Sequence, residues 1–136
     1  MALNPPQVSH DTLSRHALIV DDYAPNILIA SIFMNEFGYT YDVARNGFEA
    51  VDCIKSNKYG IVIMDVQMPY MCGLEATRIV RAYENETGKT PVKIIAVTAQ
   101  ALPIDRDRCL EAGMNDYLSK PFHADELKKK IEVLMA

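Results

Sequence analysis

The 136-residue sequence has no excess of basic residues. Its 14 lysines and arginines stand against 18 aspartates and glutamates, which gives a formal net charge of -4. Domains that bind nucleic acid through its phosphates usually carry a basic excess, so we expect no direct nucleic-acid binding. The length and the 49% share of hydrophobic residues are typical of one globular domain with a sizeable core.

The sequence also lacks a long apolar segment and a cysteine framework. No apolar run approaches the roughly 20 residues that cross a bilayer, and residues 1–16 lack the apolar stretch of a signal peptide. Cys53, Cys72 and Cys109 form no CxxC pair, and no pair of histidines lies near them in the sequence. This pattern argues against a disulfide scaffold and against a zinc site. We therefore expect a cytoplasmic domain with reduced thiols and no membrane insertion.

Common motifs of nucleotide binding and nucleophilic catalysis are absent or incomplete. Gly88-Lys89-Thr90 matches the end of a Walker A loop, but the motif needs a glycine where the sequence has Tyr83. No GxGxxG follows the first apolar run, and no GxSxG occurs. His10, His16 and His123 have no paired nucleophile in the sequence. These absences argue against dinucleotide binding, a P-loop and histidine-based catalysis.

Short apolar runs alternate with helical patterns after residue 16. The runs predict five strands, at residues 17–20, 40–45, 60–65, 93–97 and 115–119. Strict alternation of strands and helices is typical of a parallel sheet with helices on both faces. The sequence therefore predicts a doubly wound α/β fold. Residues 1–16, which contain Pro5-Pro6 and show no periodicity, are expected to form a flexible tail or linker.

The helical patterns predict five helices between and after these strands. In the first, Ile29, Ile32, Phe33 and Phe37 share one face, which we expect to be buried. Pro25 suits the first turn of this helix and Gly38 its end. Apolar residues at helical spacing mark the other four helices, near residues 50–54, 76–83, 102–112 and 127–134.

Charged and hydroxyl residues end four of the five predicted strands. Asp21 and Asp22 follow the first strand, Asp65 ends the third, Thr98 follows the fourth and Lys120 follows the fifth. Each alone has an ordinary explanation as a cap or a surface residue. In parallel sheets, however, ligands bind at the carboxyl ends of the strands. Three carboxylates there need balancing charge, which Lys120 and a hard ion such as Mg²⁺ supply.

Four motifs connect these residues to a known family. They are LIVDD at 18–22, IVIMDVQMP at 61–69 with Gly73 following, AVTA at 96–99 and AGMNDYLSKPF at 112–122. In order, spacing and strand placement they resemble the receiver domain of two-component response regulators, over about residues 17–135. The resemblance implies a flavodoxin-like sheet of five parallel strands in the order 2-1-3-4-5, with five helices.

The same resemblance implies a role for each residue at the strand ends. Asp65 is implied to accept a phosphoryl group from a phosphohistidine, aided by Lys120 and Thr98. Asp22 and Asp65 are implied to bind Mg²⁺ directly, Asp21 to bind it through water, and Gln67 to bind it through the backbone carbonyl. The Lys120-Pro121 bond is implied to be cis.

A switch is implied as well. Thr98 moves toward the phosphoryl group and Tyr117 turns into the space it leaves, which changes a surface near the fourth helix, the fifth strand and the fifth helix. Tyr117 as a simple core residue remains the alternative.

The run at 64–81, MDVQMPYMCGLEATRIVR, most resembles receivers attached to hybrid histidine kinases. The implied partner is a sensor histidine kinase or a histidine phosphotransfer protein. Cys72 departs from the family pattern, because many relatives carry an aspartate before the glycine. We expect no enzyme activity beyond the domain's own phosphorylation and dephosphorylation, although a full-length hybrid protein would be a histidine kinase.

Two other functions compete with this interpretation. Phosphatases of the haloacid dehalogenase type also use a strand-end aspartate and Mg²⁺, but they need a second aspartate where this sequence has Gln67. They also usually need a cap and a longer chain. A non-phosphorylated binding module, such as a flavodoxin-like FMN protein or a degenerate receiver, is disfavoured because the set of phosphorylation residues is complete.

Overall fold

The computed structural model describes residues 15–99 and 102–136. The predicted tail therefore lies outside the described residues, except for its last two positions. One of these, His16, is already the first residue of a strand, so regular structure begins one residue before the predicted position. No helix in the described part of the chain is both long and apolar enough to span a bilayer.

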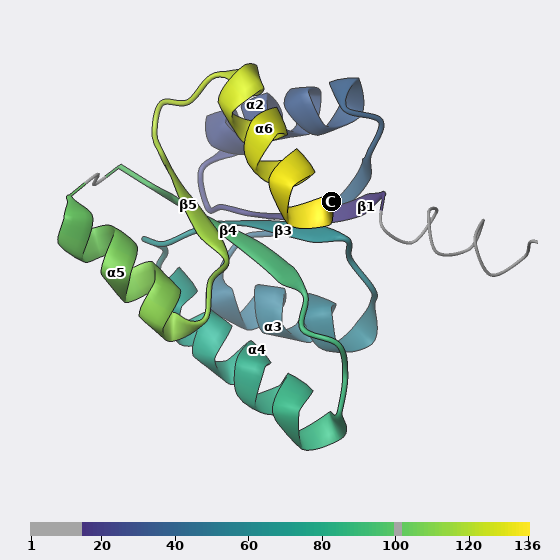
Figure 1. Ribbon diagram of the computed structural model, residues 1–136, viewed down its shortest axis with the longest axis vertical. Coiled ribbons are helices and arrows are strands. Elements are labelled where there is room, and N and C mark those ends of the chain that lie inside the picture. Colours follow the sequence, from purple (N-terminus) through teal and green to yellow (C-terminus); the bar gives the residue numbers. More distant parts are fainter. Residues whose placement is uncertain (1–14, 100–101) are drawn as a thin grey trace, which may run out of the picture.

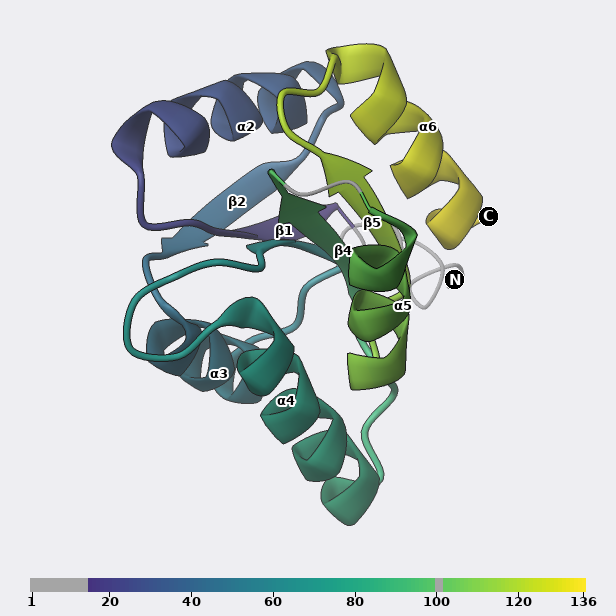
Figure 2. The same cartoon turned by 90° about the vertical axis from the view of Figure 1, so that its left-hand side faces the viewer.

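The five strands form one parallel sheet in the order β2-β1-β3-β4-β5 (Figures 1 and 2), as predicted. Their bounds are β1 (His16–Val20), β2 (Thr40–Ala44), β3 (Ile61–Asp65), β4 (Lys93–Thr98) and β5 (Asp116–Ser119). In the register, Val20 pairs with Met64 and Asp65 pairs with Val97. Strands β1, β3 and β4 therefore end level with one another, and the residues that follow them meet at one edge.

The helices cover both faces of the sheet, as the alternation of elements requires. They are α2 (Ala24–Glu36), α3 (Gly47–Ser56), α4 (Gly73–Thr87), α5 (Pro103–Ala112) and α6 (Ala124–Met135). Helices α2 and α6 lie on one face, and α3, α4 and α5 lie on the other (Figures 1 and 2). The molecule thus has three layers.

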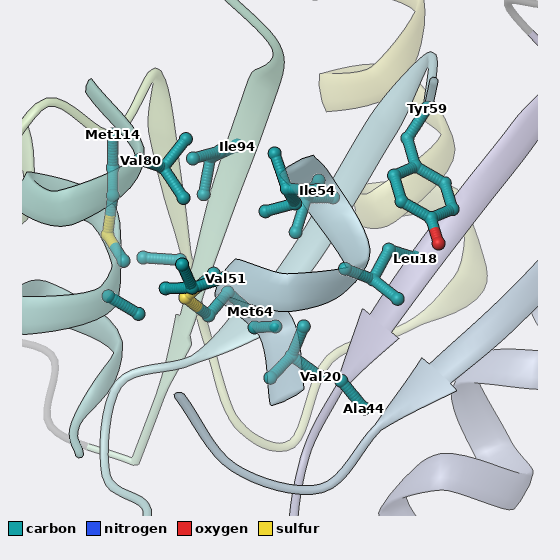
Figure 3. Packing of buried hydrophobic residues seen from close by; sticks show 14 of the residues in the cluster. Leu18, Val20, Ala44, Val51, Ile54, Tyr59, Met64, Val80, Ile94 and Met114 are labelled. Atoms are coloured by element: carbon teal, nitrogen blue, oxygen red, sulfur yellow. The ribbon is translucent and has the colours of Figure 1, made fainter. Parts of the chain in front are cut away.

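Each face of the sheet has its own apolar core, because successive residues of a strand point to opposite faces. Leu18, Met64 and Ile94 pack under α3 and α4 (Figure 3). Ala17, Ile63 and other residues of opposite parity pack under α2 and α6. The central strand β3 is buried along its whole length, which agrees with the continuous apolar run that predicted it.

The buried face of α2 differs from the prediction. Ala30, Ser31 and Met34 are buried, whereas Ile29 and Ile32 are each 47% exposed. Helix α2 is apolar on nearly all sides, so its periodicity does not distinguish the face that contacts the sheet. The predicted ends are correct, because Pro25 lies in the first turn and Gly38, at φ 85°, follows the helix.

The two described ends of the chain lie close together. Arg15 and Ala136 line the same surface groove, with Phe37 and Tyr39 from the end of α2 and the loop after it. This groove lies at the edge where β1 begins, opposite the edge at which Asp65 ends β3.

Candidate functional site

Asp21 continues β1 at the carboxyl edge of the sheet. Its amide donates to the carbonyl oxygen of Ala44 at 3.1 Å, which keeps the backbone extended one residue past the strand. Its Oδ1 accepts a hydrogen bond from the amide of Tyr23 at 3.0 Å. The residue is 7% exposed, whereas Asp22 beside it is exposed. One carboxylate is therefore fixed and the next faces solvent.

Asp65 is the last residue of β3 and is 5% exposed. Its Oδ1 accepts a hydrogen bond from the amide of Gln67 at 3.2 Å. The chain then doubles back, because the amide of Gly73 donates to the carbonyl of Val66 at 2.8 Å. A Cβ at Gly73 would overlap the carbonyl oxygen of Asp65. The glycine in the sequence motif thus allows the backbone to pass directly over the end of β3.

Lys120 reaches the two buried carboxylates from the end of β5. Its Nζ lies 3.3 Å from Oδ2 of Asp65 and 3.5 Å from Oδ2 of Asp21. Its amide donates to the carbonyl of Thr98 at 2.8 Å, and the Lys120-Pro121 bond is cis, as the resemblance implies. The side chain therefore spans from β5 across β4 to β3 and β1.

The three aspartates form one acidic cluster. Asp21, Asp22 and Asp65 each offer a carboxylate oxygen, and these oxygens lie within 4.8 Å of one another. Burial raises the pKa of Asp65, the ammonium of Lys120 opposes that shift, and the charge of Asp21 adds to it. Three negative charges against one positive charge call for a cation. Oxygen ligands from carboxylates with one open side match the chemistry of Mg²⁺.

Thr98 and Tyr117 lie on neighbouring strands and point to the same face of the sheet. Thr98 ends β4 and is 3% exposed. Tyr117 pairs with Ala96 rather than with Thr98, is partly buried, and packs against the core under α3 and α4. The ring thus lies two positions back from the site along the strand. A switch through these two residues stays a prediction.

A cavity of about 400 Å³ adjoins the acidic cluster. Asp65 and Lys120 lie on its wall, and Phe122 from the β5–α6 loop and Ile29 from α2 contribute apolar surface. Phe122 meets Phe33 of α2 edge-on, with ring centroids 6.1 Å apart. Ile29 was not predicted beside the site, because its helical spacing placed it on the face of the helix that was expected to be buried.

All the residues predicted at the strand ends are therefore at one edge of the sheet. Lys120 contacts Asp21 and Asp65, Asp22 lies in the same cluster, and Thr98 lies one residue beyond the pairing of Val97 with Asp65. The backbone of Gln67 is next to Asp65, with its amide already used by that carboxylate.

Comparison with known sequences agrees with this geometry. The family model of the response regulator receiver domain matches residues 17–132. Hybrid signal transduction histidine kinase B of Dictyostelium discoideum is 41% identical over 118 residues, which cover 81% of this chain and 6% of that kinase. Transcription factor SKN7 of Saccharomyces cerevisiae is 39% identical over 112 residues, 82% of this chain and 17% of that protein. The chain thus spans under a fifth of the length of these two relatives.

Solved structures show the same similarity. One is the co-crystal structure of the Saccharomyces cerevisiae histidine phosphotransfer protein Ypd1 and the receiver domain of its downstream response regulator Ssk1. It matches with a TM-score of 0.81 at 36% identity over 85% of each chain. The receiver domain of sensor histidine kinase PA1611 from Pseudomonas aeruginosa matches with a TM-score of 0.80 at 37% identity, over 89% of this chain and 97% of that one. That structure has a magnesium ion coordinated in its active site cleft.

Proposed function

The chain belongs to the response regulator receiver domain family, and we propose that Asp65 is the residue at which it accepts a phosphoryl group. The observation that carries the assignment is the contact of one ammonium, that of Lys120, with the carboxylates of both Asp65 and Asp21. Asp65 is also the carboxylate at the end of the central strand, on the wall of the cavity that opens beside the cluster.

The transfer reaction follows from these positions. An Oδ atom of Asp65 attacks the phosphorus of a phosphohistidine, an O–P bond forms, and the P–N bond breaks with its electron pair left on the imidazole. Lys120 balances charge on a phosphoryl oxygen, because its ammonium already lies beside Asp65. Thr98 donates its hydroxyl hydrogen to another phosphoryl oxygen. The product is an acyl phosphate on Asp65.

The acidic cluster is the proposed site of Mg²⁺. Asp22 and Asp65 would bind it directly, Asp21 would bind it through water, and Gln67 would bind it through its backbone carbonyl. When bound, the ion supplies positive charge that neutralises the transferring group. The support is the set of carboxylate oxygens within 4.8 Å of one another and the magnesium ion of the related PA1611 receiver.

The proposed donor is a phosphohistidine on a sensor histidine kinase or a histidine phosphotransfer protein. The related Ssk1 receiver forms a complex with such a phosphotransfer protein. In this chain, the exposed side chains of Tyr23, Leu28, Ile29 and Ile32 give α2 and the loop before it an apolar surface next to the site. A donor helix that packs there would bring its histidine to the mouth of the cavity.

The wider context is also a proposal. We assign residues 17–135 to the receiver unit, since the family model matches from residue 17 and α6 ends at Met135. A place in a hybrid histidine kinase is supported by the relatives of that kind. A cytoplasmic location is supported by the three free cysteines. We propose that the domain turns over only its own phosphoryl group. Gln67 and the family match weigh against a phosphatase of the haloacid dehalogenase type.

The acceptor is tested by phosphorylation with acetyl phosphate and Mg²⁺, followed by intact-mass measurement. The unmodified chain should gain one phosphate that hydroxylamine removes, and Asp65→Asn should gain none. Asp42→Asn, which changes a carboxylate in the middle of the outer strand β2, is the control and should be labelled normally. An Asp65→Asn variant that gains the same labile phosphate would overturn the assignment.

A further inference from the structure

The loop at residues 66–72, between β3 and α4, is the part of the site that departs most from regular structure. Its two ends are fixed by backbone bonds, from Val66 to Val97 at 3.0 Å and from Gly73 to Val66 at 2.8 Å. Between them, the amide of Met71 donates to the carbonyl of Pro69 at 2.8 Å. The intervening Tyr70 has a φ of 70°, which is uncommon for a residue other than glycine.

The tight turn at Tyr70 does not arise from packing of its own ring. The side chain of Tyr70 is 87% exposed, so few contacts of that ring offset its unfavourable backbone conformation. Residues held in such conformations persist when surrounding contacts determine the backbone position. Met71, the next residue, is partly buried and packs against the core under α3 and α4. The packing of Met71, and not that of Tyr70, therefore holds the backbone of this turn in place.

Met71 also contacts the first residue of α3, Gly47. A Cβ placed on Gly47 would lie 2.6 Å from the carbonyl oxygen of Met71, 2.7 Å from its Cγ and 2.8 Å from its Cβ. Gly47 does not have a positive φ. The position therefore needs glycine for space and not for backbone freedom.

The turn of α3 that receives Met71 is rigid. Oδ1 of Asn46 accepts a hydrogen bond from the amide of Glu49 at 2.9 Å. Oε1 of Glu49 in turn accepts one from the amide of Arg45 at 2.8 Å. The first bond caps the helix through Asn46, and the second ties Glu49 to the residue before the cap, so two side-chain bonds hold the start of α3. The following Ala50 is fully buried. A side chain added at Gly47 would consequently displace the loop and not the helix.

We propose that Gly47 is a positioning residue for the phosphoacceptor site. Its missing side chain lets the loop at 66–72 pack on the start of α3, and this contact sets where the backbone of Gln67 lies relative to Asp65. The inference rests on the proposed function, because it assigns the displaced backbone to the metal and phosphoryl site. It adds a residue from outside the four sequence motifs.

The result of Gly47→Ala distinguishes a positioning role of Gly47 from that of an ordinary residue in a helix. Alanine is a better helix former than glycine, so Gly47→Ala would leave the stability of the fold unchanged or raise it if no other segment contacted position 47. With Met71 in contact, the substitution should shift the loop. The backbone resonances of Gln67 and Met71 should then change in the absence of Mg²⁺.

Titration of the full chain with Mg²⁺ by calorimetry tests the proposal. Gly47→Ala should bind Mg²⁺ roughly tenfold more weakly than the unmodified chain, the effect expected when support of a ligand is lost. Gly88→Ala is the matched control, because no atom lies within 4 Å of its added Cβ and its φ of 71° makes alanine strained. That variant should lose stability while keeping its Mg²⁺ affinity.

A rescue variant completes the test. Gly47→Ala combined with Met71→Gly removes the overlapping Cγ and Cβ of Met71 but keeps its carbonyl oxygen, so it should recover part of the affinity that Gly47→Ala loses. Equal Mg²⁺ affinity in Gly47→Ala and the unmodified chain would overturn the inference, and so would a double variant that binds Mg²⁺ no more tightly than Gly47→Ala. Failure of the unmodified chain to bind Mg²⁺ would instead count against the proposed function.

Discussion

The Nζ of Lys120 lies 3.3 Å from Oδ2 of Asp65, close enough for an ion pair that crosses from β5 to β3. The same ammonium is 3.5 Å from Asp21, so it is the positive charge shared by two buried carboxylates. In Lys120→Met the chain keeps the apolar stem but leaves those carboxylates facing each other. We expect the free energy of unfolding without metal to fall by about 1–3 kcal/mol.

Urea denaturation with and without Mg²⁺ checks this expectation. Added Mg²⁺ should stabilise Lys120→Met more than the unmodified chain, because the ion would then replace the missing charge. Lys130→Met is the control, since it removes a more exposed pair with Asp116 and should cost at most about 1 kcal/mol. A Lys120→Met variant as stable as the control variant would contradict the argument.

Asp65 should destabilise the metal-free fold at neutral pH. Burial raises its pKa above the ordinary value of 3.8, so the folded state disfavours the ionised form. The free energy of unfolding should therefore fall as the pH rises from 3.8 through the raised pKa. Asp65→Asn removes this dependence and should raise the thermal midpoint at pH 7 more than at pH 4. A midpoint that drops at pH 7 would show that the carboxylate stabilises the fold.

The sheet and the edge at which the aspartates meet could be predicted from sequence, because the signals are local. The three central strands β1, β3 and β4 are short apolar runs, and Asp65 and Thr98 end two of them. The alternation of strands and helices then leaves few topologies. The buried face of α2 could not be predicted in the same way. Its apolar residues surround the helix, and the exposure of Ile29 and Ile32 depends on where the helix crosses the sheet.

Contacts between segments that are distant in the sequence could not be predicted either. The residues that flank Gly47 in the sequence give no sign of a special role, and only the fold shows that Met71 lies against it. The same holds for Tyr59, whose hydroxyl donates to Oδ2 of Asp42 at 2.8 Å. His16 stacks on the Tyr59 ring, with centroids 5.3 Å apart, and its Nε2 lies 3.1 Å from the same carboxylate. The residues of this cluster come from three separate parts of the chain.

That cluster should contribute to stability in a pH-dependent way. The hydrogen bond from Tyr59 lowers the pKa of Asp42 below 3.8, and the bond from His16 acts in the same direction. An acid with a lowered pKa stabilises the fold above 3.8, and the contribution is lost as the pH falls through the lowered value. Tyr59→Phe should therefore lower the urea midpoint at pH 7, with a smaller difference near pH 3. A double-mutant cycle with Asp42→Asn isolates the pair, and a coupling energy near zero at pH 7 would refute it.

Thr98 and Tyr117 should report phosphorylation together. Beryllofluoride, whose BeF₃⁻ stands in for the phosphoryl group on Asp65, should shift the resonances of Thr98, Tyr117 and α5 in one step. Thr98→Ala should retain bound beryllofluoride and lose the shifts at Tyr117, because the hydroxyl that draws β4 toward the site is gone. Shifts at Tyr117 that persist at full size in Thr98→Ala would make the tyrosine a core residue only.

Both described ends of the chain lie at one surface groove, which is lined by Arg15 and Ala136. Arg15 and Ala136 both lie at the edge where β1 begins, and Asp65 lies a strand's length away, about 17 Å at the usual rise per residue. A domain that is attached at this edge presents Asp65 at the opposite edge of the sheet, away from the point of attachment. Immobilised on a sensor chip through Ala136, the protein should therefore leave Asp65 accessible to a phosphodonor.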